Sequence, residues 1–162
     1  MAIVQVSPGQ RIFNASLDVE TDPSDAFALL CAVEKWPVWL PFLQSAKRVD
    51  PSTPLALGSE VLVRSSIPGE DEELYEVDQY IANFHLSLVG AYSMRRRLDF
   101  RVERKTSRSK LHLRVAYPAY HGRIGVFFDR LKHARRFNSA LDEALVHFKG
   151  LAEYGDAVVA EV

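Results

Sequence analysis

Residues 123–154 read RIGVFFDRLKHARRFNSALDEALVHFKGLAEY and carry a long, mostly apolar stripe. The residues of the stripe recur at steps of three and four, which places them on one face of a helix. They are Phe127, Leu131, Ala134, Asn138, Leu141, Leu145, Phe148 and Ala152. Gly155 follows and suits the left-handed position just past a helix end. The pattern predicts a helix on the order of 45 Å long, which needs a broad apolar surface to lie against.

The preceding part of the chain supplies that surface as a series of short strands. Residues 11–20 alternate between apolar and polar types, as a half-buried strand does. Further strand-like runs lie at residues 45–50, 58–66, 72–81, 84–91, 93–105 and 111–117. The short gaps between these runs are typical of an antiparallel meander. Strands and helices are segregated along the chain, which predicts an α+β fold with helices on one face of the sheet.

Two short helices are expected between the first strand and the others. Asp22 is a suitable N-cap, Pro23 suits the first helical position, and the apolar helix that follows should end before Pro37. Pro37 and Pro41 leave room for only a short turn or a single helical turn between them. Because residues 36–42 are rich in large aromatic side chains, we expect this stretch to plug an apolar space.

Strand parity suggests which polar groups point toward the long helix. Arg96 has the parity of Leu98, and a buried guanidinium is costly unless it is paired or met by a ligand anion. In the run 72–81, Glu76 and Asp78 share the parity of Leu74 and Tyr80, and Asn138 interrupts the helical stripe. These groups could together position a ligand carbonyl or carboxylate. Alternatively, a β-bulge would turn Arg96 to solvent, or a cross-strand pair with a carboxylate would make it purely structural.

Large aromatic and apolar residues are candidates for the walls of a cavity. Trp36, Trp39 and Phe42 are either core residues or its lip, with Trp39 the preferred wall residue. Phe127, Phe128 and Leu131 would lie near the mouth, although Phe127 also suits the core. The predicted ligand-binding set is Trp39, Phe42, Tyr80, Arg96, Leu98, Phe128, Leu131 and Asn138.

Composition bounds the remaining possibilities. The 162 residues are expected to form one domain, 1–162, with its core at about 10–155. A net charge of −1 does not favour binding to nucleic acid. No stretch suits a membrane span, and the start lacks signal-peptide features. A cytoplasmic protein is therefore expected. Cys31 lies among apolar residues and is expected to be an inert buried thiol. The histidines form no metal-binding motif, and no phosphate-binding or dinucleotide motif is present, so neither metal nor cofactor is expected.

One charge asymmetry remains. Many basic residues fall within a single hairpin, namely Arg95, Arg96, Arg97, Arg101, Arg104, Lys105, Arg108 and Lys110. Such a hairpin could meet RNA or anionic lipid headgroups, or it could simply be a solvated outer face whose charges neighbouring acids offset.

The order of elements, with Asp22-Pro23, Trp36-Pro37-x-Trp39-x-Pro41-Phe42 and the helix around Leu141–Glu153, resembles the START-like superfamily, in particular its polyketide cyclase/dehydrase and lipid-transport branch. The resemblance covers about residues 10–155. It implies a helix-grip fold, in which a curved antiparallel sheet wraps a long C-terminal helix around a hydrophobic cavity. It implies binding or transport of a lipid, polyketide or quinone-like molecule.

The alternatives are a polyketide cyclase/dehydrase-type enzyme and a protein that interacts with a membrane or RNA surface. Enolate chemistry would need an oxyanion partner and a base, for which Arg96 with Asp78 or Glu76 is the inward set that parity offers. The sequence leaves open whether a reaction is catalysed, which ligand binds and how many copies assemble.

Overall fold

The computed structural model of the protein describes residues 3–7, 10–66, 72–92, 96–106, 108–118 and 134–155. The elements in chain order are β1 (Ile3–Ser7), β2 (Gln10–Val19), α1 (Pro23–Cys31), a 3₁₀ turn (Val33–Lys35), α2 (Trp36–Trp39), β3 (Leu43–Arg48), β4 (Glu60–Ser65), β5 (Glu72–Ile81), β6 (His85–Gly90), β7 (Arg97–Arg104), β8 (Ser109–Pro118) and α4 (Ala134–Tyr154). The α+β class and the order of elements agree with the prediction. The strand β1 was not anticipated.

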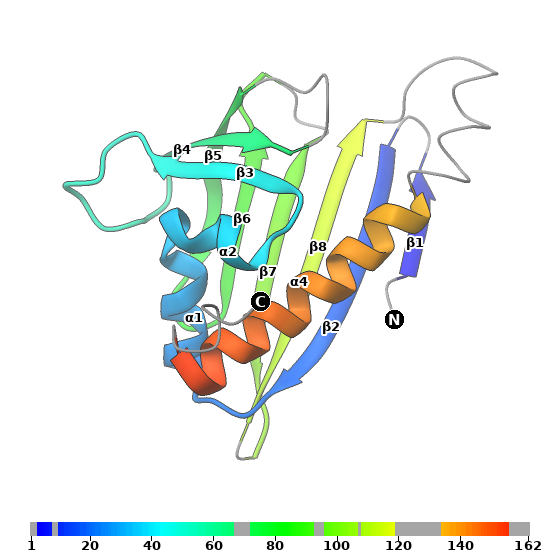
Figure 1. Ribbon diagram of the computed structural model, residues 1–162. Coiled ribbons are helices and arrows are strands. Elements are labelled where there is room, and N and C mark those ends of the chain that lie inside the picture. The colour runs from blue at the N-terminus through cyan, green and yellow to red at the C-terminus, as the bar shows by residue number, and fades with distance from the viewer. Residues whose placement is uncertain are drawn as a thin grey trace.

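The described strands form one antiparallel sheet in the order β1-β2-β8-β7-β6-β5-β4-β3. The chain therefore crosses from β2 to the opposite edge at β3 through α1 and α2, and then returns strand by strand to β8. Figure 1 shows α1, α2 and α4 in front of this curved sheet, with α4 running obliquely across it. This is the predicted helix-grip arrangement, and the concave face of the sheet is the one that holds the helices.

The helix α1 begins as its sequence predicts. The side chain of Asp22 accepts hydrogen bonds from the backbone N–H of Ser24 at 2.9 Å and from its hydroxyl at 2.8 Å, and Pro23 takes the first helical position. Asp25 lies in the first turn, near the positive end of the helix dipole.

The long helix α4 turns its apolar stripe toward the sheet. Leu141, Ala144, Leu145 and Phe148 are at most 3% exposed, whereas Val146 on the opposite side is 63% exposed. Gly155 ends the helix with a φ of 72°, the left-handed conformation expected there. The described helix spans 21 residues, and the part of the predicted helix before Ala134 lies outside the described residues.

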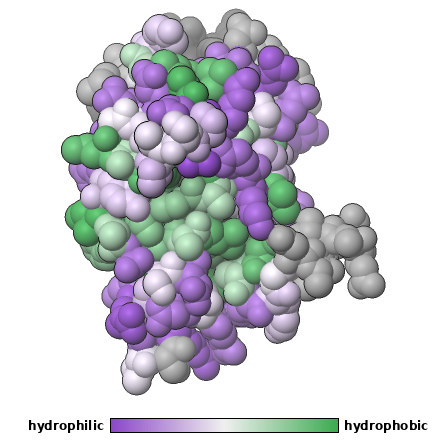
Figure 2. Space-filling view, turned by 90° about the vertical axis from the view of Figure 1, so that its left-hand side faces the viewer, coloured by the Kyte–Doolittle hydropathy of each residue, from purple (hydrophilic) through white to green (hydrophobic). Residues whose placement is uncertain are grey.

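Apolar side chains also reach the surface on one flank of the molecule. Figure 2 shows an apolar band between polar regions on the side that carries α1, α2 and the β3–β4 connection. Exposed apolar residues on these elements include Val38 at 41% and Leu57 at 68%. Within the described residues, no helix combines the length and apolarity needed to cross a bilayer.

Candidate functional site

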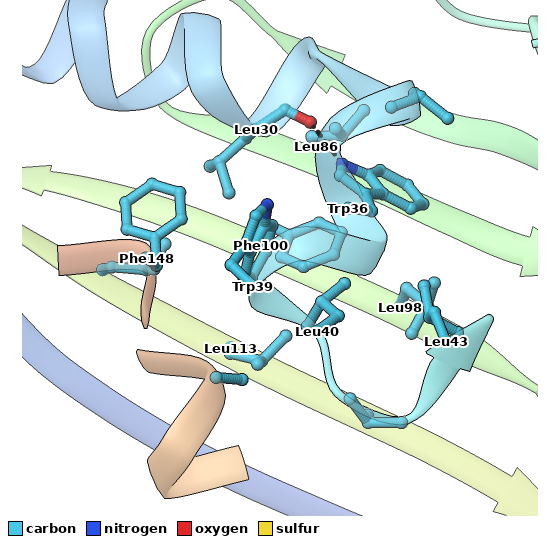
Figure 3. Packing of buried hydrophobic residues seen from close by; sticks show 14 of the residues in the cluster. Leu30, Trp36, Trp39, Leu40, Leu43, Leu86, Leu98, Phe100, Leu113 and Phe148 are labelled. Carbon is cyan, nitrogen blue, oxygen red and sulfur yellow. Dashed lines mark hydrogen bonds between the residues drawn. The ribbon is translucent and has the colours of Figure 1, made fainter. Parts of the chain in front are cut away.

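Aromatic side chains fill part of the space between the sheet and the helices. Trp36 and Trp39 are three residues apart on the short helix α2, so both point to the same side, and both are fully buried. Their rings contact Phe100 of β7 at 5.4 and 5.9 Å between centroids, and Trp39 also meets Phe148 of α4 at 5.0 Å (Figure 3). The stretch between the two prolines thus plugs the apolar interior, as expected.

The two tryptophans differ in their hydrogen bonding. The indole Nε1–H of Trp36 donates to the carbonyl of Leu30 at 2.8 Å, which satisfies a carbonyl in the last turn of α1. Trp39 Nε1 is equally buried and has no hydrogen-bond partner among the residues that the structure describes. A buried N–H without an acceptor costs about 1–3 kcal/mol of folding free energy, so this nitrogen destabilises an otherwise apolar cluster.

A second aromatic cluster lies nearer the start of α4. Phe137 of α4 contacts Phe42, Phe13 and Tyr117 with ring centroids 5.1, 4.8 and 5.6 Å apart, respectively. The next residue, Asn138, is only partly buried as a whole, but its Oδ1 is buried and accepts no hydrogen bond from any described residue. Among the described residues, the concave side therefore holds one donor without an acceptor, on Trp39, and one acceptor without a donor, on Asn138.

Arg96 forms an ion pair, but not with the carboxylates that parity suggested. Its Nε lies 3.1 Å from Glu73 Oε2, and the two side chains are 26% and 15% exposed. Glu73 is the register partner of Val63, a core residue, so the pair belongs to the concave side of the sheet. The inward parity of Arg96 and its cross-strand pairing are thus compatible with each other.

The expected partnership with Asp78 or Glu76 is wrong, because β5 contains a β-bulge. The pairing of β5 with β6 shifts between Val77 and Gln79, which reverses the parity of the residues before it. Tyr75 and Val77 are buried instead, and Glu76 is exposed.

Asp78 lies with the outward-facing side chains of the sheet. Its Oδ2 is 2.7 Å from Arg97 Nη1, which also donates to the hydroxyl of Ser87 at 2.7 Å. Arg97 and Ser87 have the opposite parity to Leu98 and Leu88, which face the core.

Two of the remaining predicted site residues, Leu98 and Tyr80, lie on strands β7 and β5. Leu98 is 3% exposed in the core. Tyr80 packs edge-on against Phe27 of α1 at 5.6 Å and interacts with the thiol of Cys31. Burial raises the pKa of both Tyr80 and Cys31, so at neutral pH the thiol stays protonated and is a weak nucleophile. Phe128 and Leu131, like Phe127, lie outside the described residues.

The described basic residues of the β7–β8 hairpin are largely paired with acids. Arg104 lies 3.7 Å from Asp22, and Arg108 lies 3.4 Å from Glu20, so the hairpin is tied to the junction of β2 and α1. Lys105 pairs with Glu103 at 3.1 Å. This arrangement favours the alternative in which neighbouring acids offset a solvated basic face.

His85 lies on the outer face of the sheet and is nevertheless buried. It is 4% exposed, and its Nε2 lies 3.2 Å from Asp99 Oδ2. Only the pairing of β6 with β7 reveals this contact, because no sequence motif links the two residues. Among the described residues, no three His, Cys, Asp or Glu side chains gather as a metal site would require.

The chain is similar in fold to several solved structures. One is the Zhui aromatase/cyclase from Streptomyces sp. R1128, with 13% identity and a TM-score of 0.67 over 88% of this chain and 93% of that one. Another is the Aha1 dimer from Colwellia psychrerythraea, with 14% identity and a TM-score of 0.61 over 90% and 98% of the two chains. A conserved protein of unknown function from Enterococcus faecalis matches 99% of this chain with 82% of its own, at 15% identity and a TM-score of 0.64.

Among curated proteins, no significant match was found. The sequence pattern of one family, described as polyketide cyclase/dehydrase and lipid transport, matches residues 10–153 and so spans β2 to the last turn of α4. The same segment forms the curved sheet and the helix it holds, which is the START-like architecture. The chain therefore belongs to the polyketide cyclase/dehydrase and lipid-transport family.

Proposed function

We propose that the protein binds a hydrophobic small molecule between the concave face of the sheet and α4. The main support is the pair of unsatisfied polar atoms on that side, Trp39 Nε1 and Asn138 Oδ1, in surroundings that are otherwise apolar. Binding sites for apolar ligands typically combine such walls with a few polar groups that fix orientation. A hydroxyl or carbonyl on the ligand would satisfy one of these atoms, and membership in a lipid-transport family favours the same role.

The residues of the proposed site fall into three groups. Trp39, Phe42 and Leu98, together with Phe128 and Leu131, would supply apolar wall, and Tyr80 would add a ring edge. Asn138 would accept a hydrogen bond from the ligand. Arg96, held by Glu73, would lie on the same side of the sheet and favour a ligand with a polar end over a pure hydrocarbon.

A neutral fluorescent probe tests this proposal. Both tryptophans of the chain are fully buried on the concave side, so N-phenyl-1-naphthylamine bound there should quench their emission by energy transfer. We expect saturable quenching at one probe per chain, reversed by 1-dodecanol. The Asn138→Leu variant should lower the affinity for dodecanol about tenfold, the effect of losing one well-placed hydrogen bond, while leaving probe affinity unchanged.

Ser139→Ala is the matched control, because Ser139 is the next residue of α4 and is exposed. This variant should bind both dodecanol and the probe as the unchanged protein does. Failure of the probe to saturate, or emission of bound probe without loss of tryptophan emission, would contradict the proposal.

A catalytic form of the same proposal is favoured by one observation, the partly buried ion pair of Glu73 and Arg96. A carboxylate and a guanidinium on the concave side are the groups that enolate chemistry needs, as base and oxyanion partner. Glu73→Gln should then abolish conversion of a poly-β-ketone without abolishing its binding. Glu76→Gln, on the same strand but exposed, should change neither property. Equal turnover in both variants would leave simple binding as the function.

A further inference from the structure

The convex face of the sheet, which is turned away from α4, carries a groove of about 500 Å³. Its floor is formed by β7 and β8, with β2 along one side and the start of β6 along the other. The residues that line it are Asn14, Ala15, Ser16, Phe84, Asp99, Arg101, Glu103, His112, Leu113 and Arg114. Its polar side chains have the opposite parity to the core residues Phe13, Leu113 and Phe100, so the groove is separate from the site proposed above.

Both acids in the groove are already paired with basic side chains. Asp99 uses both carboxylate oxygens, since Oδ1 lies 3.3 Å from Arg101 Nε and Oδ2 lies 3.2 Å from His85 Nε2. Glu103 lies 3.1 Å from Lys105 Nζ and 3.3 Å from His112 Nε2. Lys105 and His112 also lower the pKa of Glu103, which keeps it ionised and engaged.

Because of this arrangement, Arg114 has no acid partner in the part of the chain that the structure describes. It lies directly opposite Asp99 in the register of β7 and β8, where a cross-strand ion pair would normally form. The oxygens of Asp99 are occupied by Arg101 and His85, and Arg114 makes no ion pair or hydrogen bond with any residue that the structure describes. Its exposed guanidinium therefore offers a full set of donors at the groove.

Two further side chains beside Arg114 have unused hydrogen-bonding capacity. Asn14 is its register partner on β2, and Ser16 is the register partner of His112. Neither side chain bonds to any other described residue. The arginine fork, an amide and a hydroxyl thus lie on two neighbouring strands and lack acceptors, which is the donor set that a carboxylate or phosphate takes.

The opposite side of the groove carries one large apolar side chain, Phe84. Phe84 is 45% exposed and lines the groove beside Arg101 and Glu103, with its ring edge-on to His85 at 6.2 Å. We propose that the groove binds a small organic oxyanion, with a carboxylate or phosphate head at Arg114, Asn14 and Ser16 and a flat apolar body against Phe84.

Titration with small aromatic anions, followed by amide chemical shifts of ¹⁵N-labelled protein, tests the proposal. The probes are benzoate and phenyl phosphate, with acetate and inorganic phosphate as their ringless counterparts. At least one ring-bearing probe should shift β2 and β8 amides saturably and bind more tightly than its ringless counterpart. Which of the two does so identifies the head group.

Two variants and one control locate the contacts. Arg114→Ala should weaken the bound probe about tenfold, the effect of losing a charge-assisted hydrogen bond, and Phe84→Ala should remove the advantage of the ring. Arg136→Ala is the control, since Arg136 is an exposed arginine of α4 that also has no partner among the described residues. Unsaturable shifts, or equal affinity in the Arg114 and Arg136 variants, would overturn the proposal. Neither result bears on the neutral probe expected on the concave side.

Discussion

At the scale of single residues, the interior is defined by which buried polar atoms have partners. Trp36 and Trp39 lie in one helical turn, are both fully buried and both contact Phe100. Among the described residues, only the indole N–H of Trp36 has an acceptor, the Leu30 carbonyl of α1, and this bond joins α2 to α1. Trp39 contributes its ring to packing, while its N–H remains a cost that a ligand could offset.

Replacing each tryptophan by phenylalanine separates these roles. Both changes remove similar volume from the same cluster, so the packing losses should be similar. Trp36→Phe also leaves the Leu30 carbonyl unsatisfied, whereas Trp39→Phe removes an unsatisfied donor. We expect Trp36→Phe to lower the free energy of unfolding by about 2 kcal/mol more than Trp39→Phe, measured by urea denaturation. Equal losses would show that the N–H of Trp39 is not a cost in the folded state.

At the scale of elements, α1 owes its start to one carboxylate. The backbone N–H of Ser24, then its hydroxyl and more weakly Arg104, lower the pKa of Asp22. The folded-state pKa is therefore below the unfolded value of about 3.9. The ionised cap stabilises the fold above that value, and this stabilisation is lost as the pH falls through the lowered folded-state pKa.

The Asp22→Asn variant tests this dependence. Asparagine keeps the capping acceptor but carries no charge, so the melting temperature of the unchanged protein should exceed that of the variant at pH 6. The difference should shrink as the pH falls below about 4, because the aspartate then becomes protonated and neutral as well. Thermal unfolding of both proteins at several pH values gives the result, and a difference independent of pH would contradict it.

The same scale shows why some elements could be predicted and others could not. In β7 the core residues Leu98, Phe100 and Val102 share one parity, so alternation alone separates the two faces. In β5 apolar residues occupy both parities, and the bulge after Val77 leaves no mark in the sequence. Asp78 was therefore assigned to the wrong face.

For Arg96 and Asp99, the sequence indicates the face of the sheet but not the residue that each side chain pairs with. Parity gave the direction of Arg96 but not its pairing with Glu73, because the register between distant strands decides that contact. Likewise, alternation along β7 gives Asp99 the parity opposite to Leu98 and Phe100. It could not show that His85 and Arg101 would occupy both of its oxygens and leave Arg114 without a partner among the described residues.

At the scale of the whole molecule, a hydrogen bond connects the end of α4 to the β2–α1 junction. The side chain of Glu153 is 9% exposed, and its Oε1 accepts the backbone N–H of Glu20 at 2.7 Å. The same oxygen lies 3.6 Å from Lys149 Nζ one turn earlier. A contact between residues 133 positions apart thus joins the last turn of the helix to the end of the first long strand.

Removing this carboxylate should loosen the helix from the sheet. Glu153→Ala leaves the Glu20 N–H without its acceptor and should cost about 1–3 kcal/mol of unfolding free energy, whereas Glu153→Gln keeps an acceptor and should cost less. Lys149→Ala removes only the partly exposed ion pair and should cost under about 1 kcal/mol. Hydrogen exchange distinguishes local from global effects. In Glu153→Ala, amides in the last turns of α4 should exchange faster. The exchange rates of β7 amides should change only as much as the overall stability does. Uniform acceleration across α4 and the sheet would mean that the contact does not govern local opening of this end of the helix.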